Sequence, residues 1–360
     1  MKIAVYDSLE ALPPAASARF SFAHTGNFFL SAEWFRCLHQ TVTGASHEAR
    51  IYLASTDSDT PVGLGVYCRA RSSSDLRGLT TFYTGEYRPV VAFDESADAL
   101  LPEMLAYVTA ERPRWCSLEF DYLRTDRSDA DDLCRLLGAS GFWVERGHRY
   151  ENWYLPLGDM DFDAFYRARP SQMRNTIARR EKKLLKAHSV DVELFTSPSD
   201  DLDRAIRDYL HVYGSSWKAQ EPYPTFIPTL VRTCAELGIL RLGILRVDST
   251  PAAAQLWITQ TGKALIYKLA YDEKFAEFSV GSILSREMFK AAIDGDKVRE
   301  IDYGVGSEGY KRDWMSDVRR FEKVTALNPR HPRGLVSVGA AICKRVAKPL
   351  LRPLRSRAAS

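Results

Sequence analysis

Long apolar runs, paired cysteines and regularly spaced histidines are all missing from this 360-residue sequence. No apolar stretch approaches the ~20 residues that a membrane-spanning helix needs. The first residues have neither a basic start nor a long apolar segment, so we expect a cytoplasmic protein. The six cysteines lie far apart with no C-x-x-C pair, which favours buried free thiols over a disulfide framework or a zinc knuckle. The seven histidines show no ligand spacing, so we expect no metal site.

Several sequence motifs that are typical of catalytic sites are also missing. The sequence contains no nucleophile elbow, no zinc-protease helix, no Walker loop and no dinucleotide-binding glycine pattern. What it does contain is an ordinary globular composition, 45% hydrophobic and 26% charged, which excludes a disordered or collagen-like chain. At about 150 residues per domain, the length predicts two domains.

Acidic residues are absent from the last part of the chain. Residues 329–360 carry eight Lys or Arg and no Asp or Glu, whereas the whole chain has a formal net charge of only +3. The rest of the chain is therefore not strongly basic. We expect no general nucleic-acid binding, because that function needs many cations over one face of a domain.

This basic tail has three interpretations. The apolar segments 336–342 and 346–351 alternate with basic residues, which is typical of a helix that lies on the anionic inner face of a membrane. The second interpretation is an arginine-lined site for a small phosphorylated regulator, and the third is a solvated tail. The basic residues concerned are Lys344, Arg345, Lys348, Arg352, Arg355 and Arg357.

Weak self-similarity links the two halves of the chain. Residues 51–67 and 242–258 each predict a strand, a turn closed by Thr-Pro and a second strand. Each half then continues into a helical stretch with a Glu-Met pair and a short strand that ends in Asp-Tyr. The same order in both halves predicts a duplicated unit of strands and helices.

The second half can be divided more finely. Alternating apolar and polar residues predict an antiparallel meander of three strands at 239–247, 252–260 and 264–271. A small-residue break at 279–282 precedes a helix at 283–293, and strands at 300–303 and 321–327 flank a short helix at 310–315. A basic helical insertion at about 168–218, with helices at 170–190 and 199–218, separates the halves. The pattern predicts the α+β class, with domains at 1–160 and 161–328 and a tail at 329–360.

The small-residue break has a chemical consequence. Backbone N–H groups at the start of a helix are unsatisfied and lie at the positive end of the helix dipole, so they can bind a diphosphate. Ser279, Val280, Gly281 and Ser282 combine such groups with small side chains. A meander, a tight loop, a helix and a returning strand form the plan by which an acyltransferase holds coenzyme A. A simple helix cap is the alternative interpretation.

The second half resembles a GNAT acetyltransferase domain, and the whole chain resembles the two-domain branch with Fem-type aminoacyl transferases and CelD-like acetyltransferases. The resemblance covers about residues 25–330 and is strongest after 165. It is carried by Arg174–Leu184, Ala253-Ala-Gln255, Tyr267-Lys-Leu-Ala-Tyr-Asp272, Ser279-Val-Gly-Ser282, Asp302-Tyr-Gly-Val-Gly306 and Gly309-Tyr-Lys-Arg-Asp-Trp314.

The resemblance implies tandem GNAT-like folds, the first degenerate. Acetyl-CoA or another acyl-CoA would bind the second fold, beside Tyr271 and the 279–282 loop, and the acceptor would bind between the two folds. It also implies that Lys311, which follows Tyr310, stabilises the negative charge on the reacting carbonyl. Ser279 stands where the wider superfamily has a loop glycine, and Fem-type relatives use aminoacyl-tRNA, so the identity of the donor stays open.

The remaining candidates follow from the chemistry of acyl transfer. An ammonium acceptor must lose a proton before it attacks, and the strand-end carboxylates Asp272 and Asp302 are candidate bases or ordinary turn residues. Tyr303 and Tyr310 are candidate proton donors to the departing thiolate. Candidate acceptor-binding residues are Tyr83, Glu86, Tyr87, Arg88, Trp217 and Lys218. The basic helix within 167–186 would bind the 3′-phosphate of coenzyme A or an anionic lipid-linked sugar, or would simply be solvated.

Three functional hypotheses follow. The first is an acyl-CoA-dependent acyltransferase that modifies an amine or hydroxyl of a sugar in exopolysaccharide or cell-envelope biosynthesis. The second is a Fem-type transferase that adds residues from aminoacyl-tRNA to a peptidoglycan precursor. The third is a catalytically silent GNAT fold that binds a ligand and regulates assembly.

Overall fold

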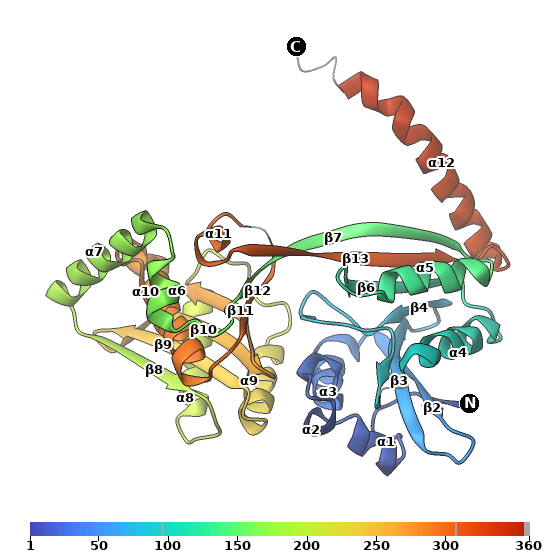
Figure 1. Cartoon of the computed structure of the whole chain (residues 1–360), viewed down its shortest axis with the longest axis horizontal. Coiled ribbons are helices and arrows are strands. Elements are labelled where there is room, and N and C mark those ends of the chain that lie inside the picture. Colours follow the sequence, from blue (N-terminus) through green and yellow to red (C-terminus); the bar gives the residue numbers. More distant parts are fainter. Residues whose placement is uncertain (95–96, 307, 356–360) are drawn as a thin grey trace. The chain divides into compact units, whose positions relative to one another are not determined.

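A computed structural model describes residues 1–94, 97–306 and 308–355 (Figure 1). The chain forms two compact units: unit 1 comprises residues 1–24, 43–149 and 320–360, and unit 2 comprises residues 25–42 and 150–319. The tail thus belongs to unit 1. The short N-terminal segment 25–42 belongs to unit 2, although the sequence pattern predicts it as part of the first domain. The chain passes between the units within the strands β7 (Trp143–Pro156) and β13 (Asp317–Leu327).

Unit 1 is built on a mixed sheet with helices around it. Its strands are β1 (Lys2–Tyr6), β2 (His47–Ser55), β3 (Pro61–Ala70), β4 (Asp75–Gly78), β5 (Val91–Ala92), β6 (Ser117–Arg124) and part of β13. Its main helices are α1 (Pro14–Arg19), α4 (Ala97–Ala110), α5 (Asp129–Ala139) and α12 (Pro332–Arg355), and α2 (Phe22–Thr25) lies at the boundary. Buried aromatic side chains of β2, β3 and β6 meet edge to face in its core.

Unit 2 likewise contains a mixed set of paired strands. Its strands are part of β7, β8 (Val190–Phe195), β9 (Leu240–Val247), β10 (Thr250–Gln260), β11 (Lys263–Tyr271) and β12 (Glu300–Val305). Its α-helices are α3 (Ala32–Leu38), α6 (Phe162–Arg167), α7 (Ser171–Ala187), α8 (Leu202–Gly214), α9 (Phe226–Glu236), α10 (Val280–Lys290) and α11 (Lys311–Trp314). Shorter turns are η1 (Phe28–Leu30), η2 (His39–Thr43), η3 (Glu273–Phe278) and η4 (Ala291–Gly295).

The strands of the two units have the same succession of pairings. In unit 1 the order is β1-β2-β3-β4-β6-β13, and in unit 2 it is β8-β9-β10-β11-β12-β7. In both, the first three pairings are antiparallel, the fourth is parallel and the fifth is antiparallel. The parallel pairing needs a crossover helix, which is α4 in unit 1 and α10 in unit 2. The duplication predicted from sequence is confirmed, and the fold class is the predicted α+β class with tandem folds.

The core of unit 2 explains why its meander forms as the alternation predicts. The Trp257 ring on β10 meets the Phe289 ring on α10 edge to face, with 5.1 Å between their centres. Phe289 in turn stacks on Trp314 of α11 at 4.7 Å and an angle of 6°. Trp257 and Phe289 have no exposed surface. Burying such rings contributes about 2–3 kcal/mol each, which fixes α10 and α11 against the sheet.

The helical insertion differs from its predicted form. The first helix, α7, matches the prediction, but the second ends at Gly214 rather than continuing to Lys218, and the predicted elements do not include α9. Ser215 and Ser216 end α8 in a turn, where the Ser216 hydroxyl donates to the Tyr213 carbonyl at 2.7 Å. The residues after α8 are therefore freed from the helix and reach the end of β11.

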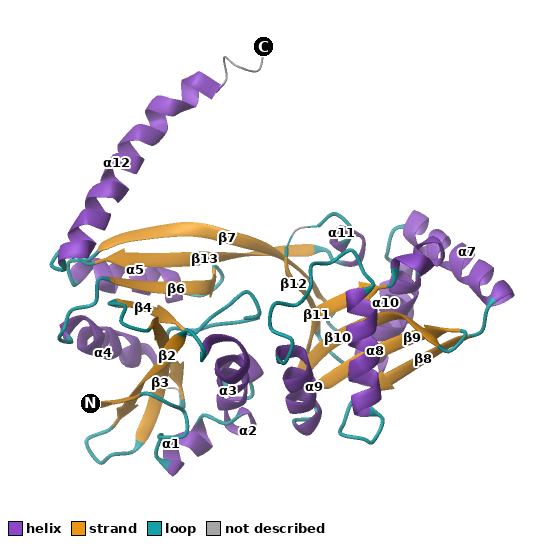
Figure 2. Ribbon diagram, turned by 180° about the vertical axis from the view of Figure 1, so that it is seen from behind, coloured by secondary structure: helices purple, strands orange, loops and turns teal. Residues whose placement is uncertain are grey.

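The tail is a helix over most of its length. Figure 2 shows α12 as a long helix that extends from the sheet end of unit 1. Leu335, Val336 and Ile342 are exposed on it, whereas Val338 is buried. Arg357, predicted as part of the basic face, lies outside the described residues. Over the described ranges, no helix has both the length and the apolar character required to cross a membrane.

Candidate active site

A cavity opens in unit 2 where two parallel strands separate. β11 and β12 pair at Lys263–Leu265 and Glu300–Asp302. Beyond this point Leu269 and Tyr271 of β11 and Tyr303 of β12 line one cavity of about 350 Å³. The other lining residues are Met173, Arg180, Trp217, Ala276, Ser279, Gly281, Ser282, Ser285, Tyr310, Asp313 and Trp314. The strands, the start of α10, the basic helix α7 and the short helix α11 thus contribute to one site.

The start of α10 supplies free backbone donors to this cavity. Ser279 adopts the left-handed conformation, with φ 55° and ψ 39°, directly before the helix. Its own N–H donates to the Ala276 carbonyl, and the N–H of Ser282 donates back to the Ser279 carbonyl at 2.9 Å. Of the four amides predicted to be free, those of Val280 and Gly281 therefore have no carbonyl acceptor among the described residues. These two N–H groups, together with the helix dipole, can bind two oxygens of a phosphate group.

A buried polar network holds Gly281 in place. The side-chain amide of Gln255 donates to the Gly281 carbonyl at 3.0 Å and to the Ser285 hydroxyl at 2.7 Å. Trp257 fixes the other end of the Gln255 amide with an indole N–H bond of 2.9 Å. A Cβ at Gly281 would lie 3.1 Å from Cδ1 of Tyr271. The first turn of α10 is thus pre-organised and has room for little beyond glycine against Tyr271.

Helix α7 brings a cation to the same point. Arg180 donates to the Ser279 hydroxyl at 2.6 Å and lines the cavity. The helix is held on α10 by Arg286, whose guanidinium bonds both carboxylate oxygens of Glu181 at 2.6 and 2.7 Å. Hydrogen bonds from Arg286 to Glu181, and to Glu287, raise the pKa of Arg286 above its ordinary value. The basic insertion therefore contributes a defined cavity residue rather than only a solvated face.

Two tyrosines form the end of the cavity near α11. Their rings meet edge to face at 5.7 Å. Tyr303 is 4% exposed, and burial raises its pKa well above the ordinary value. Tyr310 is 45% exposed, and its pKa is raised to about 12 by burial and by the nearby charge of Glu308. Both hydroxyls stay protonated at neutral pH, so each can donate a hydrogen bond.

The two carboxylates predicted as bases lie outside this set of lining residues. Asp272 is buried and caps η3, where its Oδ1 accepts the Lys274 N–H at 3.0 Å. Asp302 accepts hydrogen bonds from the Asn152 side chain at 2.6 Å and from the Gly304 N–H at 2.7 Å.

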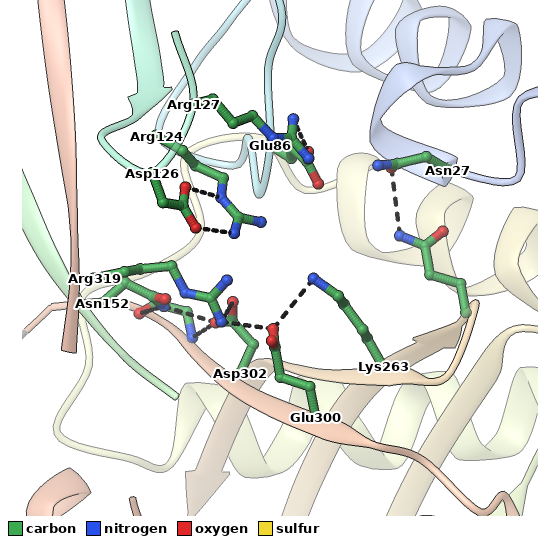
Figure 3. Close-up of polar contacts among 12 residues, drawn as sticks. Asn27, Glu86, Arg124, Asp126, Arg127, Asn152, Lys263, Glu300, Asp302 and Arg319 are labelled. Atoms are coloured by element: carbon green, nitrogen blue, oxygen red, sulfur yellow. Dashed lines mark hydrogen bonds and ion pairs between the residues drawn. The ribbon is translucent and has the colours of Figure 1, made fainter. Parts of the chain in front are cut away.

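Figure 3 shows Asp302 within a larger polar cluster, in which Arg319 lies between Glu300 and Asp302. Arg319 donates to Glu300 at 2.6 Å, contacts Asp302 at 3.6 Å and packs 3.8 Å from the centre of the Tyr154 ring. The contacts of both aspartates suit the turn-residue interpretation, and their role as bases stays a prediction.

A different carboxylate lines the cavity. Of the described lining residues, Asp313 on α11 is the one with a carboxylate, and its side chain is exposed. Asp313 belongs to the 309–314 segment that carries the family resemblance, but the sequence pattern predicts no role for it. Asp313 directly precedes Trp314 in the sequence. The Trp314 ring stacks on Phe289, and this contact fixes α11 against the cavity.

Lys311 is buried, at 3% exposure, and does not belong to the lining residues. Its ammonium donates to the Val305 carbonyl at 2.6 Å and lies 2.9 Å from the Glu308 carboxylate. The ammonium is 5.5 Å from the centre of the Tyr303 ring. Its charge therefore lies behind one wall of the cavity.

The predicted acceptor-binding residues separate into two groups. Trp217 lines the cavity and packs on Tyr271 at 4.7 Å between ring centres, and Lys218 follows it. The other four lie in unit 1. There Tyr83 and Tyr87 are buried, Glu86 pairs with Arg127 at 2.5 Å (Figure 3), and Arg88 pairs with Asp129 at 3.1 Å. The two tyrosines are thus core residues in unit 1 rather than surface stacking groups.

Within the described ranges, no group of three or more His, Cys, Asp or Glu side chains is arranged to hold a metal ion. The cavity instead combines amide donors, an arginine, two phenols and a carboxylate. This donor set suits an anionic cofactor and proton transfer.

Comparisons with known proteins agree with this geometry. Residues 171–312 match the family model for the acetyltransferase (GNAT) domain. No curated protein matches the chain in sequence. Among solved structures, FemX matches with a TM-score of 0.57 and 12% identity over 89% of this chain and 97% of that chain. A conserved protein of unknown function from Bacteroides thetaiotaomicron matches with a TM-score of 0.56 and 13% identity over 91% and 100%.

L-PGS from Bacillus licheniformis matches with a TM-score of 0.53 and 10% identity over 93% of this chain and 97% of that chain. At these identities the solved structures show the fold alone. Residues 171–312 thus match the GNAT acetyltransferase domain family, and the chain has the fold of FemX.

Proposed function

We propose that the protein transfers an acyl group from acyl-CoA, with acetyl-CoA as the first choice, to an amine or hydroxyl of a sugar. The single observation that supports this proposal is the cavity between β11 and β12, in which the start of α10 meets Tyr303 and Tyr310. A diphosphate at one end and a reacting carbonyl at the other are the two requirements of a CoA-dependent transfer.

The donor site would work as follows. The amides of Val280 and Gly281 receive the diphosphate oxygens, and Arg180 moves from Ser279 to an oxygen of the same group or of the 3′-phosphate. The ring of Tyr271 packs beside the pantetheine arm. A bound thioester is already activated, so the protein needs to position it and to stabilise the charge that develops on its oxygen.

The chemical step needs one proton acceptor and one hydrogen-bond donor. We assign the acceptor role to Asp313, whose carboxylate takes the proton from the attacking amine or hydroxyl. The new carbon–heteroatom bond forms as the carbon–sulfur bond breaks, and Tyr303 or Tyr310 donates a hydrogen bond to the departing sulfur. The ammonium of Lys311, 5.5 Å from the centre of the Tyr303 ring, favours negative charge on the carbonyl oxygen.

The donor site is tested by titration calorimetry with acetyl-CoA. Arg180→Ala should weaken binding about 10- to 100-fold, since a charged hydrogen bond contributes about 1.5–3 kcal/mol. Arg179→Ala is the matched control, because Arg179 is the exposed neighbour on the same helix and is not a lining residue. Equal affinities of the two variants would remove Arg180 from the donor site.

The same titration separates the alternatives. If neither variant nor the parent binds acetyl-CoA but the protein retains aminoacyl-tRNA, the Fem-type hypothesis replaces this one. Binding of acetyl-CoA without turnover of any amine or hydroxyl would favour the ligand-binding regulator.

We also propose that α12 holds the enzyme at the inner face of a membrane, near lipid-carried sugars of the cell envelope. The support is the composition of the helix, which carries Lys and Arg but no acidic residue, and its exposed apolar side chains Leu335, Val336 and Ile342. An amphipathic basic helix of this kind binds anionic lipid surfaces.

A further inference from the structure

We propose that Lys218, which lies beside Lys268 and Lys311 on the α8 face of the β11–β12 separation, binds an oxyanion of the acceptor, so that the acyl acceptor carries a carboxylate or a phosphate. This inference rests on the proposed function and names its substrate class. The lysine cluster consists of Lys218, Lys268 and Lys311. Each lysine is the sequence neighbour of a residue that lines the donor cavity, namely Trp217, Leu269 and Tyr310.

The cluster lies on the opposite face of the sheet from the start of α10. Successive residues of a strand point to opposite faces, and Leu269 lines the donor cavity, so Lys268 points the other way. There its ammonium lies 5.5 Å from the ring centre of Tyr213, which belongs to α8. The ammonium of Lys218 lies 5.8 Å from the same ring. An acceptor that enters from the α8 face would therefore contact these lysines. The donor would enter from the other face and contact the backbone amides of α10.

The three ammonium groups of this cluster differ in their partners. Lys268 pairs with Glu221, and Lys311 pairs with Glu308. Among the described residues, no hydrogen bond or ion pair engages the ammonium of Lys218. Lys218 thus lies beside two ion-paired lysines without an ion pair of its own among the described residues.

The surroundings of Lys218 disfavour the charged form of its side chain. Burial, and then the charges of Lys268 and Lys311, lower the pKa of Lys218 to about 8, and the charges of Glu308 and Glu221 offset only part of this effect. An ammonium held among like charges without a counter-ion destabilises the free protein, so a bound oxyanion would be stabilising in the same place. A carboxylate or a phosphate group would give this ammonium an ion pair.

The donor is an unsuitable source of this oxyanion. Its phosphates have their own site at Arg180 and the amides of Val280 and Gly281, on the other face of the sheet. The acceptor is the reactant left to carry it. Trp217 and Tyr310, both about half exposed, flank the cluster with aromatic surface suited to a sugar ring.

The test measures the reactivity of Lys218 in the full-length protein. The protein is labelled briefly with acetic anhydride at pH 8, and the rates at individual lysines are read by mass spectrometry. Sodium phosphate or sodium acetate replaces sodium chloride at constant ionic strength. Only the neutral amine reacts, so an oxyanion that raises the pKa of Lys218 by one unit should slow its labelling about fivefold.

Lys182, exposed on α7, is the internal reference and should label at a constant rate. In Lys268→Gln the protection of Lys218 should fall below about twofold, whereas Lys186→Gln, an exposed position on α7, should keep it. Protection at lower phosphate than acetate concentration identifies a phosphate-bearing acceptor, and the reverse order identifies a carboxylate.

An unchanged rate at Lys218 in both salts overturns the proposal, and it does so in the unmodified protein, so folding of the variants is not at issue. Because the assay contains no CoA, it is independent of the calorimetry that tests the donor site. A protein that fails to bind acetyl-CoA but shows protection would contradict the proposed function while leaving the oxyanion site standing.

Discussion

At the scale of single residues, the account depends on which carboxylate receives the acceptor's proton. Asp313 lines the cavity, whereas Asp272 caps η3 and Asp302 lies in a polar cluster with Arg319. A general base contributes about 10²–10⁴-fold to the rate. Asp313→Asn should therefore lower kcat by about 10²-fold or more, with the affinity for acetyl-CoA changed less than about twofold.

The measurement is the rate of thiol release together with calorimetry on the same preparation. Asp317→Asn is the matched control, because Asp317 follows closely in sequence and is not among the lining residues. Equal losses in the two variants, or a loss only in donor affinity, would contradict the assignment to Asp313.

The sequence identifies the residue types of this site better than their roles. Tyr303, Tyr310, Gly281 and Ser282 are predicted and all line the cavity. Asp272 and Asp302 are singled out because they end strands, yet strand-end carboxylates also cap turns, and sequence alone does not separate the two uses. Asp313 is missed because a charge in a four-residue helix has no pattern of its own. Its position is set by the stack of Trp314 on Phe289, which is a tertiary contact.

At the scale of elements, α12 is the helix with the clearest separate role. Each basic residue near an anionic surface adds about 1 kcal/mol to binding. The double variant Lys344→Glu/Arg345→Glu should therefore bind phosphatidylglycerol vesicles at least about 30-fold more weakly than the parent, as measured by co-sedimentation.

The control is the double variant Lys182→Glu/Lys186→Glu on α7, which removes as much positive charge from another basic helix. Parent-like binding by the α12 variant, or equal binding to neutral phosphatidylcholine vesicles, would show that α12 is not the anchor.

Helices and strands with a regular alternation of apolar and polar residues are mostly predicted well. Boundaries that depend on specific hydrogen bonds or on contacts with residues far away in the sequence are not. The strands β9, β10 and β11 agree with the predicted meander because alternation marks every residue of each strand. The unpredicted α9 is an exception, because its buried residues Phe226, Leu230 and Cys234 recur at helical spacing in the sequence. The overlong second helix of the insertion has a local cause. Helical spacing runs past Gly214, and the turn at Ser215 and Ser216 is fixed by local hydrogen bonds that composition does not reveal.

At the scale of the whole molecule, the free energy of unfolding should decrease at acidic pH, because Glu193 becomes protonated there. Arg204 donates to both oxygens of Glu193 at 3.1 and 2.9 Å, and Arg246 adds a bond of 2.9 Å. The bonds from Arg204, and then those from Arg246, lower the pKa of Glu193 to about 2. The folded state thus binds fewer protons than the unfolded state between pH 2 and the ordinary value of about 4.3, so the contribution exists above that window and is lost as the pH falls through it.

Glu193→Gln should lower the free energy of unfolding by about 1 kcal/mol at pH 7, a value discounted for the partial exposure of the pair. The difference from the parent should shrink as the pH falls toward 2 in urea titrations. Glu236→Gln, at the exposed end of α9, should show no such trend. A deficit at Glu193 that stays constant with pH would contradict the electrostatic explanation.

The duplicated architecture is visible in the sequence, but the exchange of segments between the units is not. Recurring turns and dipeptides reveal two similar units because they recur in the same order. The membership of residues 25–42 in unit 2 rests on contacts such as the Phe28 N–H to the Gln260 side chain at 2.7 Å and the Trp34 ring 6.2 Å from Phe226. Hydrophobic packing is not directional, so the sequence does not show which distant residues an apolar side chain contacts.

The most direct test of the central claim is a crystal structure of the protein with acetyl-CoA. The account predicts diphosphate oxygens about 3 Å from the amide nitrogens of Val280 and Gly281, with Arg180 turned from Ser279 to a phosphate and the acetyl group near Tyr303. Density for the donor at any other place, with Arg180 still bonded to Ser279, would contradict it.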